Sequence, residues 1–247
     1  MVAPRRPIGQ SCNVSGSGFV AGQIAAVLPD FQRNGGTMAR TSVRPRLIVG
    51  ISGASGAIYG ARLLELLQPV AVETHLVISR SAELTLALET PLKPADLRAR
   101  ADVVHANTDL AAPIASGSFP TIGMVVAPCS IRSMAEIATG VTTTLLTRAA
   151  DVVLKERRRL VLMVRETPLH TGHLRTMMTL SEIGAVIAPP VPAFYAKPQN
   201  LDEMIDQTLG RVLDLFGLDS GTVRRWGEPP ADGERPLRSK PRDTAKR

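Results

Sequence analysis

Aromatic residues are scarce in this sequence, cysteines are few, and apolar runs are short. Phe, Tyr and Trp make up 3% of the 247 residues, which is little for a protein that stacks nucleic-acid bases. The two cysteines, Cys12 and Cys129, lie too far apart to suggest a disulfide framework, which fits a reducing cytoplasm. No apolar run reaches the roughly 20 residues that span a membrane. These absences predict a cytoplasmic protein with neither nucleic-acid nor membrane partners.

The basic charge lies in the tails. The formal net charge is +7, yet residues 46–223 hold 16 basic and 17 acidic side chains. We therefore predict an N-terminal extension over residues 1–45 and a basic C-terminal tail over 229–247, both disordered because they are rich in charge and proline. The first residues also have the basic start of a targeting peptide, but no clear cleavage site follows, and Met38 is an alternative start to Met1. Residues 46–228 form the predicted domain.

Apolar strand patterns alternate with helical ones across this domain, which predicts an α/β fold. We expect a single Rossmann-like or flavodoxin-like domain, a parallel sheet with helices on both faces. The strands are expected at 46–52, 72–79, 122–128, 160–165 and 184–188. The helices are expected at 56–68, 81–90, 131–140, 143–157, 171–183 and 201–216. Asn200 is expected to cap the last helix, with Glu203 at the capping-box position.

Small hydroxyl side chains follow the predicted strands. Ligands of open parallel sheets bind beyond the carboxyl ends of the strands, so these positions form a candidate site for an anionic group. The residues are Ser52, Ser55, Ser79, Ser81, Ser130 and Ser133, with Arg165 and Glu166 after the fourth strand.

The glycine-rich stretch GISGASG, residues 50–56, is typical of a phosphate-binding turn between a strand and a helix. A dinucleotide site expects an acidic residue at the end of the second strand, where Ser79 stands instead. Its glycine spacing also differs from the dinucleotide pattern, so a mononucleotide such as FMN fits better. Glycines that serve only a tight turn are the remaining alternative.

Three other motifs have a structural and a chemical interpretation. Ser130 in APCSIRSM is either a helix cap or a phosphate ligand, and Cys129 before it is more typical of a packed thiol than of a nucleophile. His170 and His173 lack a third ligand at metal spacing, which favours helix capping over a metal site. Tyr195, in a proline-rich loop, either fills the core or offers its hydroxyl to a ligand.

Several of these blocks in series resemble the UbiX flavin prenyltransferases, which include members first called phenolic acid decarboxylase B subunits. The resemblance covers about residues 46–228 and rests on GISGASGAIYG, IASGSF, VVAPCSIRSM, LLTRAADVVLKERR, VRETPLHTGHL and VPAFYAKPQ. It implies an enzyme that joins a dimethylallyl group from dimethylallyl monophosphate to N5 and C6 of reduced FMN. The prenylated FMN would serve a UbiD-type decarboxylase, in ubiquinone or phenolic-acid metabolism. It also implies a homo-oligomer, a dodecamer, and no metal.

The resemblance also assigns roles to single residues. The flavin site would comprise Gly53, Ala54, Ser55, Ser79, Ser130, Ile131, Arg132, Ser133 and Arg148. The prenyl phosphate site would comprise Lys155, Arg165, Glu166, Tyr195 and Arg211. The catalytic residues would be Ser55, Glu89, Lys155 and Glu166. In the sequence, Lys155 approaches the strand that delivers Arg165 and Glu166, so we expect these charges to gather at one rim.

Leu110 stands where some members of this family carry a tryptophan, so stabilisation of an allyl cation would have to come from the flavin or elsewhere. Two other functions remain as alternatives. One is an FMN-binding carrier subunit of an aromatic acid decarboxylase, without turnover of its own. The other is a decarboxylase of peptidyl cysteines, which needs a histidine near the first helix; none occurs between residues 46 and 74.

Overall fold

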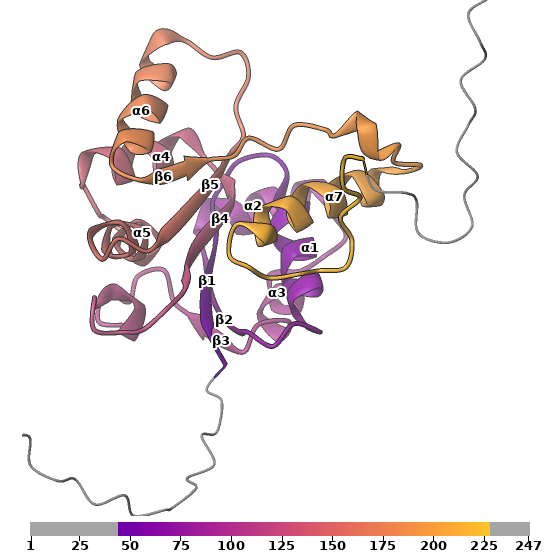
Figure 1. The fold of residues 1–247 in the computed structure, drawn as a ribbon. Helices are drawn as coiled ribbons and strands as arrows, with labels where there is room; N and C mark the ends of the chain where they lie inside the picture. The colour runs from indigo at the N-terminus through magenta and orange to yellow at the C-terminus, as the bar shows by residue number, and fades with distance from the viewer. Residues whose placement is uncertain (1–43, 228–247) are drawn as a thin grey trace, which may run out of the picture. The chain divides into compact units, whose positions relative to one another are not determined.

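A six-stranded parallel sheet forms the centre of residues 44–227, the part of the chain that the computed structural model describes (Figure 1). The spatial order is β3-β2-β1-β4-β5-β6, and every neighbouring pair is parallel. This is the doubly wound order in which strand succession reverses between β1 and β4. The strands are β1 (Arg46–Ile51), β2 (Glu73–Ile78), β3 (Val103–His105), β4 (Gly123–Cys129), β5 (Arg159–Val164) and β6 (Ala185–Ile187). The predicted fold class is confirmed.

Helices cover both faces of the sheet (Figure 1). One face carries α1 (Ala57–Leu67), α2 (Arg80–Glu89), α3 (Pro94–Ala99) and α7 (Leu201–Asp214). The other face carries α4 (Ile131–Thr139), α5 (Leu145–Lys155) and α6 (Thr171–Glu182). Two short 3₁₀ turns, η1 (Pro113–Ala115) and η2 (Phe194–Ala196), lie in the connections.

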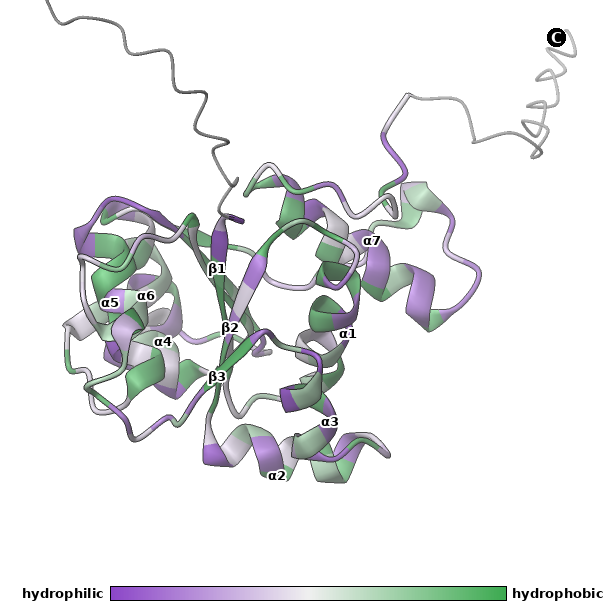
Figure 2. Cartoon of the chain, turned by 90° about the horizontal axis from the view of Figure 1, so that it is seen from below, coloured by the Kyte–Doolittle hydropathy of each residue, from purple (hydrophilic) through white to green (hydrophobic). Residues whose placement is uncertain are grey.

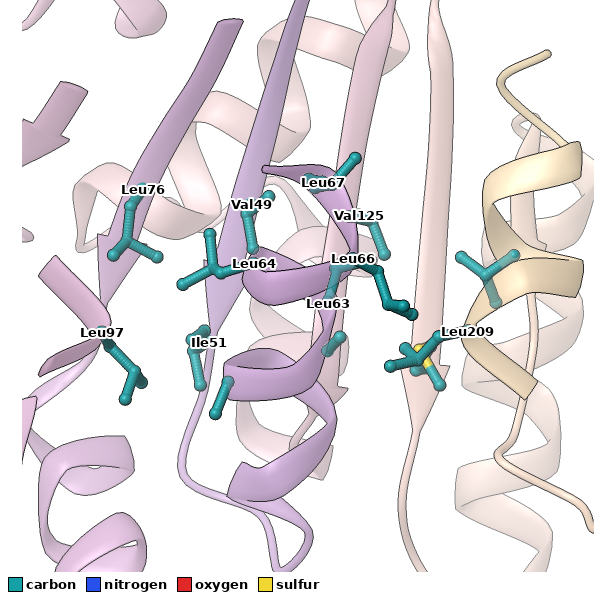
Figure 3. Packing of buried hydrophobic residues seen from close by; sticks show 14 of the residues in the cluster. Val49, Ile51, Leu63, Leu64, Leu66, Leu67, Leu76, Leu97, Val125 and Leu209 are labelled. Carbon is teal, nitrogen blue, oxygen red and sulfur yellow. The ribbon is translucent and has the colours of Figure 1, made fainter. Parts of the chain in front are cut away.

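Side-chain alternation along the strands divides the core into two clusters. In β1, Leu47, Val49 and Ile51 join the cluster under α1 and α7, whereas Ile48 joins the cluster under α4 and α5. Successive strand residues point to opposite faces, so one apolar strand supplies both layers. Figure 3 shows the first cluster, in which leucines of α1 pack against the sheet. Figure 2 shows the same two helical layers from below, on either side of the strands.

Every predicted strand and helix is present, with ends within two residues of the expected ones. Two elements were missed, β3 and α3. β3 has only three residues, and Val104 in it is 42% exposed, so the edge strand has no long apolar run. α3 has only six residues, of which Leu97 alone is buried, so it shows no helical periodicity.

The tails were predicted over residues 1–45 and 229–247. Apart from residues 44 and 45, they lie outside the described part of the chain, as does Cys12. Arg44 is described and pairs with Asp102 at 2.8 Å. Among the described residues, none of the helices combines the length and the apolar character that a membrane crossing requires.

Candidate functional site

Ser52 ties the ends of β1 and β4 together at the point where the strand order reverses. Its hydroxyl donates to the Pro128 carbonyl at 2.9 Å and accepts the backbone N–H of Ser130 at 2.7 Å. Ser52 is only 1% exposed, so these bonds are shielded from water and hold both turns rigidly. The glycine turn after β1 therefore lies beside the start of α4, where doubly wound folds bind ligands.

A groove of about 340 Å³ opens at this edge of the sheet, within the range of roughly 300–1,000 Å³ that is typical of small-molecule sites. It is lined by Ser79, Arg80, Ser81, Leu84, Asn107, Ser130, Arg132, Ser133, Glu136, Thr144, Leu146 and Thr147. Four of the predicted flavin residues are among them: Ser79, Ser130, Arg132 and Ser133. We call this feature the rim groove.

Two helices begin at the rim groove, and each start is capped by a serine. Ser79 accepts the Ala82 N–H at 3.1 Å at the start of α2, and Ser130 accepts the Ser133 N–H at 3.2 Å at the start of α4. Helix N-termini carry partial positive charge and attract anions such as phosphate. Leu84 and Leu146 add apolar surface suited to an aromatic ring. The residues of the rim groove thus fit a phosphate-bearing ring compound such as FMN.

Asn107 is a rim-groove residue that the sequence did not reveal. Its carbonyl accepts the Leu145 N–H at 2.8 Å, and its side-chain Oδ1 accepts the Leu146 N–H at 3.0 Å. Asn107 thereby holds the start of α5 against the groove. It follows β3, and because the sequence does not predict that strand, it does not place Asn107 at a strand end either. The only available signal was the polar stretch HANTD after an apolar pair.

Ser55 and Glu89 form a second group next to the rim groove. Glu89 Oε2 accepts the backbone N–H groups of Gly56 at 2.8 Å and Ala57 at 3.1 Å. Partial desolvation opposes ionisation of Glu89, but hydrogen bonds from Ser55, Gly56 and Ala57 outweigh it, so the pKa of Glu89 lies below its usual value. Glu89 is therefore a carboxylate at neutral pH.

Gly53 connects this group to the rim groove. Any side chain at position 53 would overlap Ser81 at the start of α2, so the turn approaches α2 more closely than another residue would allow. Gly53, Ala54 and Ser55 lie beside the groove, although none of them lines it.

Arg165 follows β5 and reaches the same group. Its charge lowers the pKa of Glu89, and it also opposes the rise in the pKa of Tyr59, which burial causes. Arg165, Ser55 and Glu89 thus form one cluster, which we call the rim charge cluster. Glu166 is exposed beside it, and its Oε1 accepts the Thr167 N–H at 3.0 Å.

Tyr195 and Arg211 belong to the C-terminal part of the described chain. The hydroxyl of Tyr195, in η2, accepts a hydrogen bond from Gln207 Nε2 at 3.2 Å. Arg211 lies one helical turn beyond Gln207 on α7, and its Nη1 pairs with Asp214 at 2.5 Å. Tyr195 therefore contacts α7 about one turn before Arg211.

Lys155 lies near the amino-terminal ends of the strands, at the opposite end of the sheet from the rim groove. It is the last residue of α5, and β5 begins only four residues later at Arg159 and then runs to Val164. Six strand residues span about 20 Å, so Arg165 and Glu166 lie at the far end of this strand. Lys155 Nζ pairs with Glu156 at 2.5 Å instead. The expectation that Lys155 joins these two residues at one rim is therefore wrong within a single chain.

Arg148 does not line the rim groove either. On α5, it pairs with Asp151 at 2.8 Å, an i,i+3 contact on the helix surface. Ile131, the first residue of α4, packs its side chain on the core cluster under α4 and α5 and does not line the rim groove.

The structural interpretation of two other motifs is confirmed. Cys129 is buried, and burial raises the pKa of its thiol to about 12, so it is a packed, protonated thiol. His170 caps α6, because its Nδ1 accepts the N–H groups of Gly172 at 3.0 Å and His173 at 3.3 Å.

Leu110 is 52% exposed in the turn before η1. Residues 44–227 contain no cluster of three metal-ligating side chains.

A doubly wound sheet with a groove at its switch point is the architecture of a nucleotide-binding class of protein. A comparison with protein families agrees. Residues 36–213 match the family described as Flavoprotein. The chain is 63% identical over 184 residues to flavin prenyltransferase UbiX of Escherichia coli (strain K12), covering 73% of this chain and 97% of that protein. It is 56% identical over 181 residues to flavin prenyltransferase UbiX of Thauera aromatica, covering 73% and 93%. The chain belongs to the UbiX flavin prenyltransferase family.

Two solved structures share this fold. AnUbiX (PadA1), in complex with FMN and dimethylallyl pyrophosphate, matches with a TM-score of 0.74 and 51% identity, covering 75% of this chain and 98% of that one. A dodecameric FMN-dependent UbiX-like decarboxylase from Escherichia coli O157:H7 matches with a TM-score of 0.72 and 49% identity, covering 74% and 100%.

Proposed function

We propose that this flavin prenyltransferase moves a dimethylallyl group from dimethylallyl monophosphate to N5 and C6 of reduced FMN, and that a UbiD-type decarboxylase receives the prenylated FMN. The observation that carries the proposal is Arg165, a cation of the rim charge cluster that does not line the rim groove and is therefore separate from the proposed flavin site. A protein that only stores flavin needs one anion site, whereas a transferase that releases phosphate needs a second. The relative that holds FMN together with a prenyl diphosphate supports this arrangement.

FMN would occupy the rim groove. Ser79, Ser130 and Ser133 offer hydroxyl groups there, and the starts of α2 and α4 offer positive helix ends. The turn Gly53–Ser55 lies beside the groove, where Gly53 approaches Ser81. Reduced FMN, when bound, supplies the electron-rich N5 and C6 atoms that accept the allyl group.

The other residues would act on the leaving phosphate. When the C–O bond of the prenyl phosphate breaks, its electron pair leaves with the phosphate, which gains negative charge. Arg165 and Arg211 would hold that charge, Tyr195 would donate a hydrogen bond to it, and Glu166 would carry protons. Ser55 and Glu89 would act at the reacting centre. These groups supply charge and protons without a metal.

Lys155 can join this phosphate site only from another copy of the chain. Its position at the amino edge of β5 separates it from Arg165 by the length of the strand. In a symmetric assembly, however, the amino-terminal ends of the strands of one copy can contact the rim groove of a neighbouring copy. We propose a homo-oligomer, a dodecamer, in which Lys155 of one copy completes the site of another. The dodecameric relative supports this proposal.

The mass of the flavin tests the function directly. Purified protein would be incubated anaerobically with reduced FMN and dimethylallyl monophosphate, and the extracted flavin would be analysed by mass spectrometry. We expect a gain of one prenyl unit. An unchanged flavin that stays bound to the protein would instead identify a carrier subunit.

We further propose that residues 46–228 form the complete FMN-binding transferase domain. The β1 strand begins at Arg46, and the segment that packs on α7 reaches Trp226. Removal of residues 1–37 and 229–247 should leave assembly and prenylation unchanged. A monomeric or inactive core would contradict these boundaries.

A further inference from the structure

Gln207 is a buried polar residue that the proposed mechanism does not use. It lies on α7, is 3% exposed, and faces the segment that follows α7. That segment, residues 218–226, runs back along α7 (yellow in Figure 1). We call it the return segment. A buried amide needs partners for its oxygen and for both hydrogens of its nitrogen.

The return segment fixes the orientation of the Gln207 amide. Gln207 Oε1 accepts the backbone N–H of Arg224 at 2.8 Å, and Nε2 donates to the backbone carbonyl of Arg224 at 3.0 Å. A backbone N–H can only donate and a carbonyl can only accept, so the amide cannot be turned over. The position of the nitrogen is therefore determined by the backbone.

The second hydrogen on Nε2 is directed at Tyr195. The distance from Gln207 Nε2 to the Tyr195 hydroxyl oxygen is 3.2 Å. An amide N–H is a donor only, so the phenol oxygen must accept this bond. The proton of the phenol then remains available to an external acceptor. A hydroxyl group that accepts a hydrogen bond is also polarised into a stronger donor.

The surroundings of Tyr195 keep the hydroxyl in place while leaving it accessible. Trp226 packs edge-on against the Tyr195 ring, with a centroid distance of 5.6 Å, and Arg224 Nη1 donates to the Ala196 carbonyl at 3.0 Å. Tyr195 itself remains 42% exposed. The return segment can lie this close because α7 has a glycine at position 210, where any side chain would overlap Val223.

We propose that Gln207 is a positioning residue that fixes Tyr195 as a one-way hydrogen-bond donor to the phosphate of the prenyl substrate. The proposal rests on the proposed function, in which Tyr195 binds that phosphate. It adds a residue that never touches the substrate, and it assigns the return segment a role in the affinity for the prenyl donor.

Two substitutions separate this role from a purely structural one. Gln207→Met keeps the length of the side chain but removes the donor, so KM for dimethylallyl monophosphate should rise about three- to tenfold, the worth of one hydrogen bond. Gln207→Glu reverses the bond, because a carboxylate accepts the phenol proton, and KM should rise at least as much. The affinity for FMN should stay unchanged in both variants.

A double-mutant cycle with Tyr195→Phe gives the decisive comparison. If Gln207 acts through the phenol, Gln207→Met should not raise KM further in the Tyr195→Phe background. Thr208→Val, a neighbouring position on α7, is the matched control and should keep the wild-type KM. Within residues 44–227, the hydroxyl of Thr208 bonds only the Met204 carbonyl. Thermal melting of each variant reports whether the fold is intact.

Equal effects of Gln207→Met in both backgrounds, or an unchanged KM in the single variant, would overturn the proposal. If the Gln207 variants do not fold, a crystal structure of the wild-type complex with FMN and dimethylallyl monophosphate decides. Tyr195 must then contact a phosphate oxygen while it keeps its bond to Gln207. If the wild-type protein transfers no prenyl group at all, the proposed function fails instead. That result differs from an active enzyme whose KM is unchanged in the Gln207 variants.

Discussion

Glu89, at the end of α2, accepts the backbone N–H of Gly56 at 2.8 Å, at the start of α1 and 33 residues away in sequence. Gly56 has φ of 97° and no side chain to cap α1. The Glu89 carboxylate, from another helix, therefore accepts the N–H groups of both Gly56 and Ala57. The same carboxylate contacts Ser55 and lies near Arg165. The start of α1 and the proposed reacting centre therefore depend on one side chain.

Glu89→Gln should reduce prenyl transfer strongly while lowering stability only modestly. Because both N–H groups bond to one carboxylate oxygen, the amide oxygen can still accept them, but the negative charge is lost and Ser55 loses an anionic partner. We expect a loss of about 1 kcal/mol in stability, discounted because Glu89 is exposed, and at least about a tenfold loss in rate. Urea denaturation and single-turnover prenylation measure the two effects. Glu83→Gln on the same helix, which breaks the ion pair with Arg98, should leave the rate unchanged; an equal loss there would refute the assignment.

Two inactive variants should restore activity when they are mixed. In assemblies of Lys155→Ala and Glu166→Gln chains, a site that takes Lys155 from one copy and Glu166 from another is intact. Random mixing would give about a quarter of such sites. Co-expression with two affinity tags, followed by a flavin mass assay, measures the recovery. The control combines Lys155→Ala with the double variant, which can form no intact site. No recovery in the first mixture would contradict a site that two copies share.

Ser133→Ala should weaken FMN binding without affecting the fold. Its hydroxyl lines the rim groove and contacts only Ser130 within the described residues. Loss of one neutral hydrogen bond costs about 0.5–1.5 kcal/mol, or roughly two- to tenfold in Kd. Fluorescence titration with FMN measures the change. Thr139→Ala, at the far end of α4, is the control, and an equal change in Kd there would mean that α4 is affected as a whole.

Asp102 should make stability depend on pH in the acid range. Burial opposes its ionisation, but bonds from the Thr74 N–H at 2.8 Å, from Arg44 and from the Thr74 hydroxyl lower its pKa below the usual 3.8. Because the folded pKa is the lower one, this stabilisation is present above pH 3.8 and is lost as the pH falls through the folded value. Asp102→Asn should cost about 1 kcal/mol or less at pH 7, a figure reduced because water screens this partly exposed carboxylate.

The pH profile distinguishes this effect from a general loss of packing. The difference between wild type and Asp102→Asn, measured by urea denaturation, should shrink as the pH falls below 3.8, the usual pKa of the carboxyl. A constant difference between pH 7 and pH 3 would contradict the linkage.

Local patterns in the sequence determined most of the fold. Apolar runs such as 46–52 predict strands because a parallel strand is buried on both faces. Helix starts can be predicted because a capping side chain bonds a backbone N–H within three residues. Ser130 caps α4 as predicted, and Asn200 caps α7 by accepting the Glu203 N–H at 2.9 Å. Glu203 departs from the expected capping box, because its carboxylate accepts the Gln199 N–H instead. The sequence also located the rim groove, since chain direction alone puts the strand ends at one edge.

Only the tertiary structure decided which distant side chains meet. Glu89 reaches Gly56, and Gln207 reaches Tyr195, through the packing of helices that no local spacing encodes. Lys155 and Arg165 are ten residues apart in sequence, yet β5 runs between them and holds them at opposite edges of the sheet. The periodicity of apolar residues shows which face of a helix or strand is buried, because each residue's own side chain determines whether it favours burial. Distances across the fold depend on how whole elements pack, and that is a property of the assembled chain.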